Sequence, residues 1–431
     1  MTFRIAPLSR RSALMAGALA SAAALTAACG AGASSSSGSG GSGDGLTILV
    51  EAGGKGELQP IADQYAKDKG TKVTFVELPY DGLYNRLSSE FSTGSVSFDV
   101  AALDEIWLTG FKDALAPLDD LVTDEAKADL FPSLLSAAQI EGTFVGMPAW
   151  ANTEILFYRT DLFEDEANKT AFESEYGRPL QPPTTWQEYA ECAKFFTKDG
   201  LYGTDVKGAV ETEYLAHLLQ AGESEMVIGA DGTCNLGDAA SLEALTFYTS
   251  LLPYAPSGAA QVDWAGAQNL FQQGQTAMMR FWGHAYRAVP EDSPVAGKVG
   301  AAPMIGGSAG VAGVPGGWFL SVPAAGSKQE AAKDFIAYAY EHNALSVETT
   351  LGLAARKSVF EEYKSKKGYE HYAAILTTLD APATASRPAN AKWQEIVDSA
   401  LIPMVQKSVE DGADLVAVLD EAKQKIDGIL A

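Results

Sequence analysis

Between residues 46 and 103, short apolar runs alternate with segments of helical periodicity, and this alternation constrains the fold more than any other feature. The runs that predict strands are 46–50, 72–78 and 98–103. In the segments between them, apolar residues recur every three or four positions, as on one face of a helix. Because parallel strands need a crossover connection, the β-α-β-α-β order predicts an α/β fold with a parallel sheet covered by helices on both faces.

The rest of the chain continues this mixture of strands and helices. Apolar runs at 154–158 and 318–322 predict further strands. Pro182 and Pro183 exclude helix before them, and a threonine ahead of Trp186 is placed to cap the helix that follows. Two amphipathic helices are predicted near the end of the chain, at 328–343 and 414–430.

Residues 1–28 have the pattern of an export signal. Three arginines precede an alanine-rich apolar run at 13–25, which is too short and too weakly apolar to be a preferred membrane span. The stretch Ser9–Met15 resembles a twin-arginine signal, although Ala13 stands where that pattern favours phenylalanine. Export by the twin-arginine route and by the general secretory route both remain open.

Small residues then lead into Cys29, in a stretch that resembles a bacterial lipoprotein box with Leu25 four places before the cysteine instead of three. A diacylglycerol on Cys29 supplies two acyl chains, which suffice for stable anchoring. Residues 29–45 are otherwise almost pure glycine and serine, which predicts a flexible tether. The alternative is an ordinary cleavage site with an incidental cysteine.

Charge and composition exclude several classes of protein. The net charge is −24, or about −27 without the three arginines of residues 1–28, which argues against nucleic-acid partners. The length and the 47% apolar content suggest two lobes with a large core. The four scattered histidines support no metal site, no nucleotide-binding motif is present, and no cofactor is expected. Two buried free thiols are favoured over a disulfide for Cys192 and Cys234.

Several later segments together resemble the extracellular solute-binding proteins of bacterial ABC importers, specifically the carbohydrate-binding branch. The segments that carry the resemblance include FDVAALDEIWLTGF, GMPAWANTEILFYRTDLF, FQQGQTAMMRFWGHAYR, GGWFLSVPAAGSKQEAAKDF and RPANAKWQEI. Each is weak alone, but their order and spacing are specific. They extend from about residue 46 to the C-terminus.

The resemblance implies a periplasmic-binding-protein-like fold, with two lobes, each a mainly parallel sheet flanked by helices, and ligand held in the cleft between them. Three hinge crossings are expected near 147–153, 316–322 and 351–357. The expected division is a signal peptide at 1–28, a lipidated tether at 29–45, an N-terminal lobe at 46–148 plus 322–350, and a C-terminal lobe at 149–321 plus 351–431.

A sugar presents hydroxyls at its ring edge and an apolar C–H face, so carboxylates, amides, arginines and flat aromatics at strand ends and crossings are the candidate ligand contacts. The candidate ligand-binding residues are Glu51, Asp104, Glu105, Trp150, Asn152, Trp282, Gly316, Gly317, Trp318, Arg356 and Arg387. Helix capping by Asp104, core packing of the tryptophans and hinge ion pairs of the arginines are the structural alternatives.

Three of these positions rest on specific arguments. Asp104 follows a predicted strand at the end that faces a cleft in an open parallel sheet. Trp282 matches a tryptophan that stacks on sugar in resembling disaccharide binders. Trp318 follows Gly316 and Gly317, which allow close backbone approach and a positive φ.

The expected function is capture of a mono-, di- or oligosaccharide or a polyol and its delivery to the permease of an ABC importer, by a monomeric, exported protein anchored outside the cell membrane through Cys29. An enzyme is not expected, because no catalytic motif stands out, although a carboxylate pair for glycoside hydrolysis is not excluded. The alternatives are a secreted carbohydrate-active enzyme, a surface adhesin, and a binder of a peptide, polyamine or phosphodiester.

Overall fold

The computed structural model describes residues 45–229 and 231–431, and these belong to a single compact unit. The expected signal peptide at 1–28, the lipidation of Cys29 and all of the tether except Gly45 lie outside the described residues. The alternation of strands and helices that the sequence predicts is confirmed over the described residues, and the fold is α/β.

The first sheet has five strands in the order β2-β1-β3-β12-β6. Their bounds are β1 Leu46–Glu51, β2 Val73–Leu78, β3 Val100–Asp104, β6 Met147–Trp150 and β12 Trp318–Ser321. The first three strands are parallel, as predicted, whereas β12 runs antiparallel to both β3 and β6. Strand β12 therefore returns through the sheet from a distant part of the chain and pairs Trp318 with Asp104 and Trp150.

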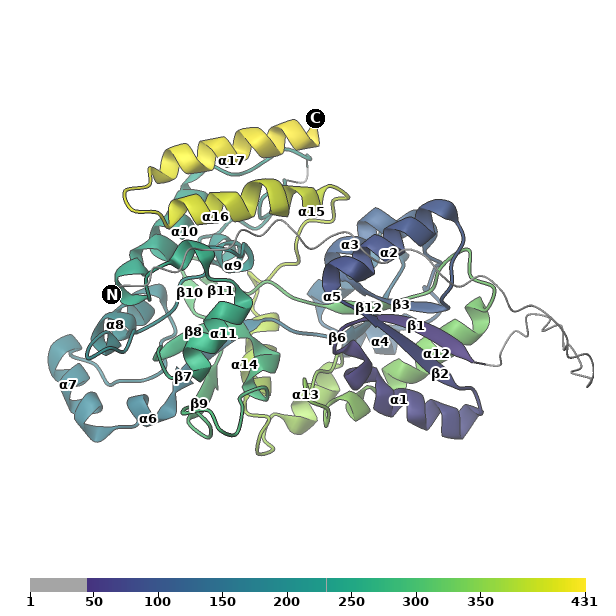
Figure 1. Cartoon of the computed structure of the whole chain (residues 1–431), viewed down its shortest axis with the longest axis horizontal. Helices are drawn as coiled ribbons and strands as arrows, with labels where there is room; N and C mark the ends of the chain where they lie inside the picture. Colours follow the sequence, from purple (N-terminus) through teal and green to yellow (C-terminus); the bar gives the residue numbers. More distant parts are fainter. Residues whose placement is uncertain (1–44, 230) are drawn as a thin grey trace, which may run out of the picture. The chain divides into compact units, whose positions relative to one another are not determined.

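Helices cover both faces of this sheet (Figure 1). Helices α2 (Tyr80–Thr93) and α3 (Glu105–Phe111) pack on one face, and α1 (Gly54–Lys69) packs on the other beside α12 (Gln329–Glu341). Two short helices and a hairpin complete this part: α4 Asp124–Asp129, α5 Pro132–Ala138, β4 Gln139–Ile140 and β5 Thr143–Phe144.

The second sheet differs from the sequence expectation. Its strands β7 (Glu154–Arg159), β8 (Met278–Trp282) and β9 (Val299–Ala302) follow the order β8-β7-β9, and both pairings are antiparallel. The expected mainly parallel sheet in the second lobe is therefore wrong. A parallel pairing needs a crossover that returns to the same end of the sheet. Here a long helical excursion separates β7 from β8, and β8 reaches β9 through a loop of 3₁₀ structure and turns.

Helices surround the second sheet and extend beyond it. They are α6 Thr160–Phe163, α7 Glu166–Tyr176, α8 Trp186–Phe196, α9 Thr212–Gln220, α10 Ala239–Ser250, α11 Trp264–Gln272, α13 Lys357–Tyr363, α14 His371–Leu379, α15 Trp393–Ile396, α16 Ile402–Ser408 and α17 Leu415–Leu430, with the hairpin β10 Gly306–Gly307 and β11 Gly310–Val311. Thr185 caps α8 by accepting from the backbone N–H of Glu188, as predicted. Cys192 and Cys234 are buried free thiols.

A π-helical turn, Val397–Leu401, joins α15 to α16. Proline at position 403 has no N–H to donate to the carbonyl of Ser399, so the regular α-helical bond is missing there. This is the kind of position at which a helix widens by one residue.

Three chain segments connect the two sheets, and they are hydrogen-bonded to one another. Ala151 donates its N–H to the carbonyl of Ala354 at 2.7 Å, and Gly316 donates to the carbonyl of Asn152 at 2.9 Å. Thr153 and Pro315 form an antiparallel bridge. The three crossings expected from the sequence therefore lie side by side.

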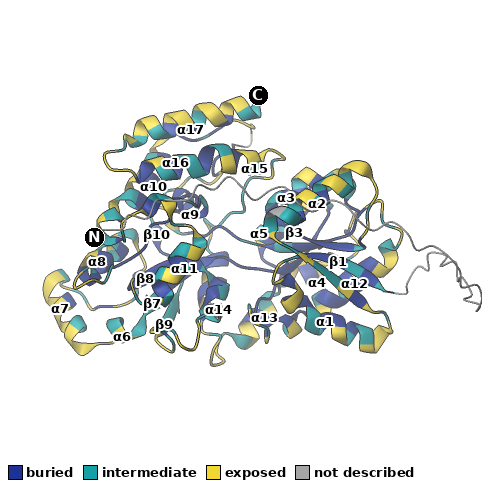
Figure 2. Ribbon diagram, viewed as in Figure 1, coloured by how far each residue is buried: buried dark blue, intermediate teal, exposed yellow. Residues whose placement is uncertain are grey.

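Burial follows this arrangement, with the strands largely buried and the outer faces of α7 and α17 exposed (Figure 2). On the second sheet, Ile155 and Phe157 face one hydrophobic cluster, which also contains the first sheet, while Leu156 between them faces the other. No helix among the described residues is both long and apolar enough to cross a bilayer.

A buried carboxylate anchors the third crossing. Glu57, on α1, is 1% exposed and accepts hydrogen bonds from the hydroxyl of Thr349 and from the backbone N–H groups of Leu351, at 3.0 Å, and Leu353, at 3.4 Å. These three donors belong to the segment that leads into the crossing.

We therefore expect Glu57→Ala to destabilise the protein by on the order of 3 kcal/mol, because buried donors lose their acceptor. Urea unfolding followed by circular dichroism measures this free energy. Glu57→Gln keeps one acceptor and should lose less, and Glu173→Ala, at an exposed position of α7, should lose almost nothing. Equal losses for Glu57→Ala and Glu173→Ala would show that Glu57 does not hold the crossing.

Candidate ligand-binding cavity

A cavity of about 520 Å³ lies where the carboxyl ends of β1 and β3 face elements of the second lobe. This volume is within the range of small-molecule sites. Its polar and aromatic lining residues are Glu51, Tyr80, Asp104, Trp150, Asn152, Glu211, Thr212, Trp264, Trp282, His284, Trp318, Arg387, Gln394 and Asp398. Residues from both lobes therefore surround one space.

The cavity brings together most of the residues singled out from the sequence. Those that line it are Glu51, Asp104, Trp150, Asn152, Trp282, Gly316, Trp318 and Arg387. Glu105, Gly317 and Arg356 do not line it. Strand ends and crossings thus gather residues that lie more than three hundred positions apart in the chain.

Arg387 forms a buried ion-pair cluster at one end of the cavity. Its NH2 group donates to Oδ1 of Asp104 at 3.0 Å, and its Nε donates to Oε1 of Glu105 at 2.9 Å. The second oxygen of Asp104 accepts from the hydroxyl of Tyr80 at 3.0 Å. Asp104 also caps α3, because Oδ1 accepts from the backbone N–H of Ile106. Asp104 therefore does both: it caps α3, which was the structural alternative, and it also lines the cavity.

Two other carboxylates in the cavity have raised pKa values. Burial, together with the charge of Asp104, raises the pKa of Glu51 to about 7. Burial raises the pKa of Glu211 above its ordinary value, and repulsion from Asp104 and Asp398 adds to this rise while Arg387 opposes it. Both groups therefore resist ionisation in this cavity.

Aromatic rings form two walls. Trp150 and Trp318, on neighbouring strands β6 and β12, lie stacked with centroids 5.9 Å apart and planes at 26°. Across the cavity, Trp282 and Trp264 pack at 5.5 Å. Flat apolar faces of this kind suit the C–H face of a sugar ring.

Glycine at position 316 is required by the close approach of Trp282. A Cβ built there would lie 2.5 Å from the Trp282 ring, a distance that no side chain can adopt. Neither Gly316 nor Gly317 has a positive φ, so of the two properties that glycine allows there, close packing is the one that this structure uses. At Gly317 a Cβ would meet Leu134 at 2.4 Å.

An amide completes the polar lining. Asn152 is 5% exposed, and its Nδ2 lies 2.9 Å from Nδ1 of His284, while its Oδ1 is buried without a hydrogen-bond partner. Burial lowers the pKa of His284 to about 4, so this imidazole is neutral at neutral pH.

Arg356 lies elsewhere, at the start of α13. Its Nε donates to Oδ2 of Asp129 at 2.7 Å, and its guanidinium lies over the ring of Tyr340. This is the hinge ion pair that the sequence analysis held as the alternative to ligand contact.

The sequence analysis did not select Tyr80 or Trp264. Tyr80 lies just after the end of β2, and Glu51 and Asp104 are the last residues of their strands, so the strand-end argument applies to Tyr80 as well. Trp264 begins α11 and has no comparable signal in the sequence.

A buried ionic cluster lies behind Trp264, and sequence reasoning did not anticipate it. Lys207 pairs with Asp205 and Glu213, and Glu213 also pairs with Arg280; all four side chains are at most 1% exposed. The Lys207 Nζ lies 5.5 Å from the centroid of the Trp264 ring. Among residues 45–229 and 231–431, no group of three or more His, Cys, Asp or Glu side chains is suited to hold a metal ion.

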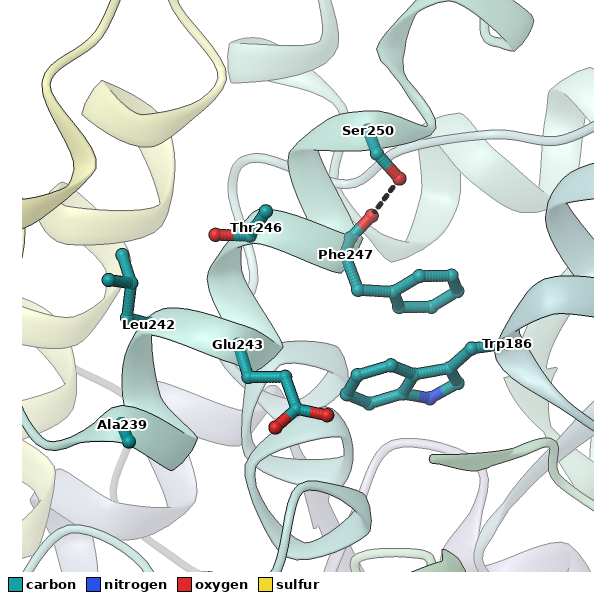
Figure 3. Close-up of a pocket in the computed structure, with 7 residues that line it drawn as sticks. All are labelled: Trp186, Ala239, Leu242, Glu243, Thr246, Phe247 and Ser250. Carbon is teal, nitrogen blue, oxygen red and sulfur yellow. Dashed lines mark hydrogen bonds between the residues drawn. The ribbon is translucent and has the colours of Figure 1, made fainter. Parts of the chain in front are cut away.

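A second, more open groove of about 500 Å³ lies over α8 and α10 (Figure 3). Its floor is the stacked pair of Trp186 and Phe247, with planes at 2° and centroids 4.4 Å apart. The indole N–H of Trp186 is already committed to Gln220. Because one lobe alone supplies its lining, this groove lacks the two-sided enclosure of the larger cavity.

Comparison with known proteins agrees with the fold. The family model described as "Bacterial extracellular solute-binding protein" matches residues 51–344. A binding protein of Brucella abortus is 26% identical over 377 residues, which are 85% of this chain and 87% of that protein. The mannitol-binding protein of Pseudomonas aeruginosa is 28% identical over 62% of each chain. The maltose-bound MalE3 of T. maritima superimposes with a TM-score of 0.73 at 22% identity, covering 89% of this chain and 99% of that one.

The raised pKa of Glu51 makes stability depend on pH. Between its ordinary pKa of 4.5 and its folded pKa of about 7, the folded protein retains a proton that the unfolded chain has released, so this group lowers stability as pH rises through that window. Glu51→Gln should therefore stabilise the unliganded protein by on the order of 2–3 kcal/mol above pH 7, and by much less at pH 5.

Thermal melts of both proteins at pH 5 and pH 8 measure this difference. The matched control is Glu173→Gln, at an exposed position of α7. A Glu51→Gln variant that gains nothing at pH 8 would contradict the assigned environment of Glu51.

Proposed function

Because the chain belongs to the bacterial extracellular solute-binding proteins, with a family match over residues 51–344, we propose that it captures a sugar or polyol in the interlobe cavity and delivers it to the permease of an ABC importer. The observation that carries the proposal is the combination of two aromatic walls with buried hydrogen-bonding groups around one space. Polar groups alone would suit many solutes, whereas flat rings opposite carboxylates match the two kinds of surface on a sugar.

The similar proteins support this choice of solute. The relative from Pseudomonas aeruginosa is named for mannitol, and the similar structure from T. maritima contains maltose. At these levels of identity, the similar proteins support sugars and polyols as the class of solute for this chain. Which sugar or polyol binds depends on the geometry of the hydroxyl contacts.

We assign ligand contact to the residues that line the cavity. Trp150, Trp282 and Trp318 offer stacking faces, and Trp264 extends the wall beside Trp282. Glu51, Asp104 and Asn152 offer acceptors for hydroxyls, and Gly316 allows close backbone approach. Arg387 lines this space and is bonded to Asp104 and Glu105, while Gly317 packs against Leu134 outside the lining.

The proposed lobes are residues 46–148 plus 322–350, and 149–321 plus 351–431, with the crossings as hinges. Hinged closure of two lobes around a ligand is a known type of switch. Because Trp318 pairs with Asp104 in the first sheet, we move the proposed boundary so that Trp318–Ser321 belong to the N-terminal lobe, and we assign the hinge of the second crossing to the N-terminal side of Trp318.

For the N-terminal part, the proposal is export through a signal at 1–28, followed by lipid anchoring at Cys29 on the outer face of the membrane. The family is extracellular, and a relative in Streptococcus pneumoniae is named as a solute-binding lipoprotein. A tether of glycine and serine gives the binding domain reach toward a permease.

Removing a stacking tryptophan should weaken sugar binding. We expect Trp282→Ala and Trp318→Ala to lose about 2–3 kcal/mol of binding free energy, which is roughly a 30- to 150-fold rise in Kd. Titration calorimetry measures Kd after a thermal-shift screen of sugars and polyols identifies a ligand. Trp318 also packs against Trp107 and Tyr80, so its variant should melt earlier as well.

The matched control is Trp186→Ala, because Trp186 lies in the separate groove and should leave Kd unchanged. If no sugar or polyol binds the wild-type protein, the proposed function fails. If a sugar binds and both cavity variants retain wild-type Kd, the stacking assignment fails.

The anchor has its own test. Cys29→Ala removes the thiol that would carry the lipid, so the protein should move from the membrane fraction to the soluble fraction with its sugar affinity unchanged. Membrane fractionation with immunoblotting measures the distribution, and Cys192→Ala, at a buried cysteine of α8, serves as the control. A Cys29→Ala variant that stays in the membrane fraction would contradict lipid anchoring.

A further inference from the structure

The lining of the cavity is unevenly charged. Four carboxylates line it, from Glu51, Asp104, Glu211 and Asp398. Among the described lining residues, Arg387 is the single lysine or arginine. Because His284 is neutral at neutral pH, it contributes no second cation. The cavity therefore holds more carboxyl groups than cations, and two of these carboxyl groups, Glu51 and Glu211, have raised pKa values.

Arg387 does not neutralise this excess. Its Nε and NH2 groups are already bonded to Glu105 and Asp104, and its side chain is 8% exposed. The single guanidinium of Arg387 is thus shared between the two carboxyl groups of Asp104 and Glu105. Among the described lining residues, no lysine or arginine forms an ion pair with Glu51, Glu211 or Asp398, although the charge of Arg387 favours the ionised form of Glu211.

The charge of Asp104 opposes ionisation of both Glu51 and Glu211. Glu51 and Asp104 end the neighbouring parallel strands β1 and β3 of the first lobe, whereas Glu211 immediately precedes α9 of the second lobe. The charge of Asp104 acts on both Glu51 and Glu211, so the three groups share one small volume. No hydrogen bond or ion pair to Glu51 is formed by the described residues.

The hydrogen-bonding groups of the cavity also favour a ligand that carries donors. An ionised carboxylate accepts hydrogen bonds and donates none, and a cation beside Glu51 or Glu211 favours the ionised form. Asn152 adds an acceptor, since its Oδ1 is buried without a partner in the same lining. A ligand that fits here supplies donors and positive charge.

We propose that the captured sugar carries a protonated amino group, which lies among Glu51, Asp104 and Glu211. This inference rests on the proposed function and narrows its ligand to an amino sugar. An ammonium has three donors and no acceptor, and it forms the stronger, charge-assisted kind of hydrogen bond with carboxylates. A ring hydroxyl satisfies single oxygens of the same groups but leaves their mutual repulsion unrelieved.

The same charges exclude an acidic sugar. A uronate or sugar phosphate would add an anion next to groups that already resist ionisation, and like charges at such distances are strongly unfavourable. The aromatic walls remain compatible with an amine, because tryptophan faces attract cations as well as C–H groups.

The test is a titration-calorimetry panel at pH 7 in which ligands differ only in one substituent. Glucosamine, galactosamine, mannosamine and the glucosamine disaccharide are each compared with the neutral sugar of the same ring and linkage, with the N-acetylated form and with the uronate. We expect at least one amino sugar to bind tenfold or more tightly than its neutral and N-acetylated counterparts, and the uronates to bind least.

Variants locate the amine. Glu51→Gln and Glu211→Gln keep the size of the side chain and an oxygen acceptor but remove its charge, so each should reduce the preference for the amino sugar over the neutral sugar by at least fivefold. Glu243→Gln, in the separate groove over α10, should leave that preference unchanged.

The outcomes separate the two claims. Neutral sugars that bind as tightly as their amino forms overturn this inference and leave the proposed function standing. Binding of simple ammonium compounds without any sugar overturns both, as does a panel in which no sugar or polyol binds. A preference for the amine that survives both glutamine substitutions overturns the assigned position.

Discussion

The ion-pair cluster of Arg387 with Asp104 and Glu105 is the interaction on which the cavity depends. It joins a loop after α14 to the ends of β3 and α3, so it ties together segments from the two lobes at the cavity edge. Removing one partner of a buried pair leaves an uncompensated charge, which is strongly destabilising. The cluster therefore fixes both the position of Asp104 in the lining and the path of the chain beside it.

The fold could be predicted from the sequence where local pattern and topology agree. Strands β1 to β3 and their helices follow from periodicity, because each parallel strand must be followed by a crossover. The second sheet could not be predicted in this way. Long helical segments separate its strands β7 and β8 in the chain. The residues of β7 and β8 do not indicate whether the two strands pair in parallel or antiparallel.

The candidate site shows the same division. Glu51 and Asp104 could be selected because a strand end has a known place in an open sheet. Arg356 has the same chemistry as Arg387 and the same plausibility in the sequence, yet Asp129 holds it at the hinge. Trp264 is placed by packing against Trp282 and by the buried Lys207 cluster, and both depend on contacts between distant segments.

The close packing of Trp282 against Gly316 links a cavity wall directly to a crossing. The Trp282 ring already lies against the backbone of Gly316 and cannot come closer to it. A bend in that crossing therefore moves the peptide group that contacts the indole. The emission of an indole depends on its immediate surroundings. We therefore expect the emission of Trp282 to change when the second crossing bends, whether or not the solute contacts its ring.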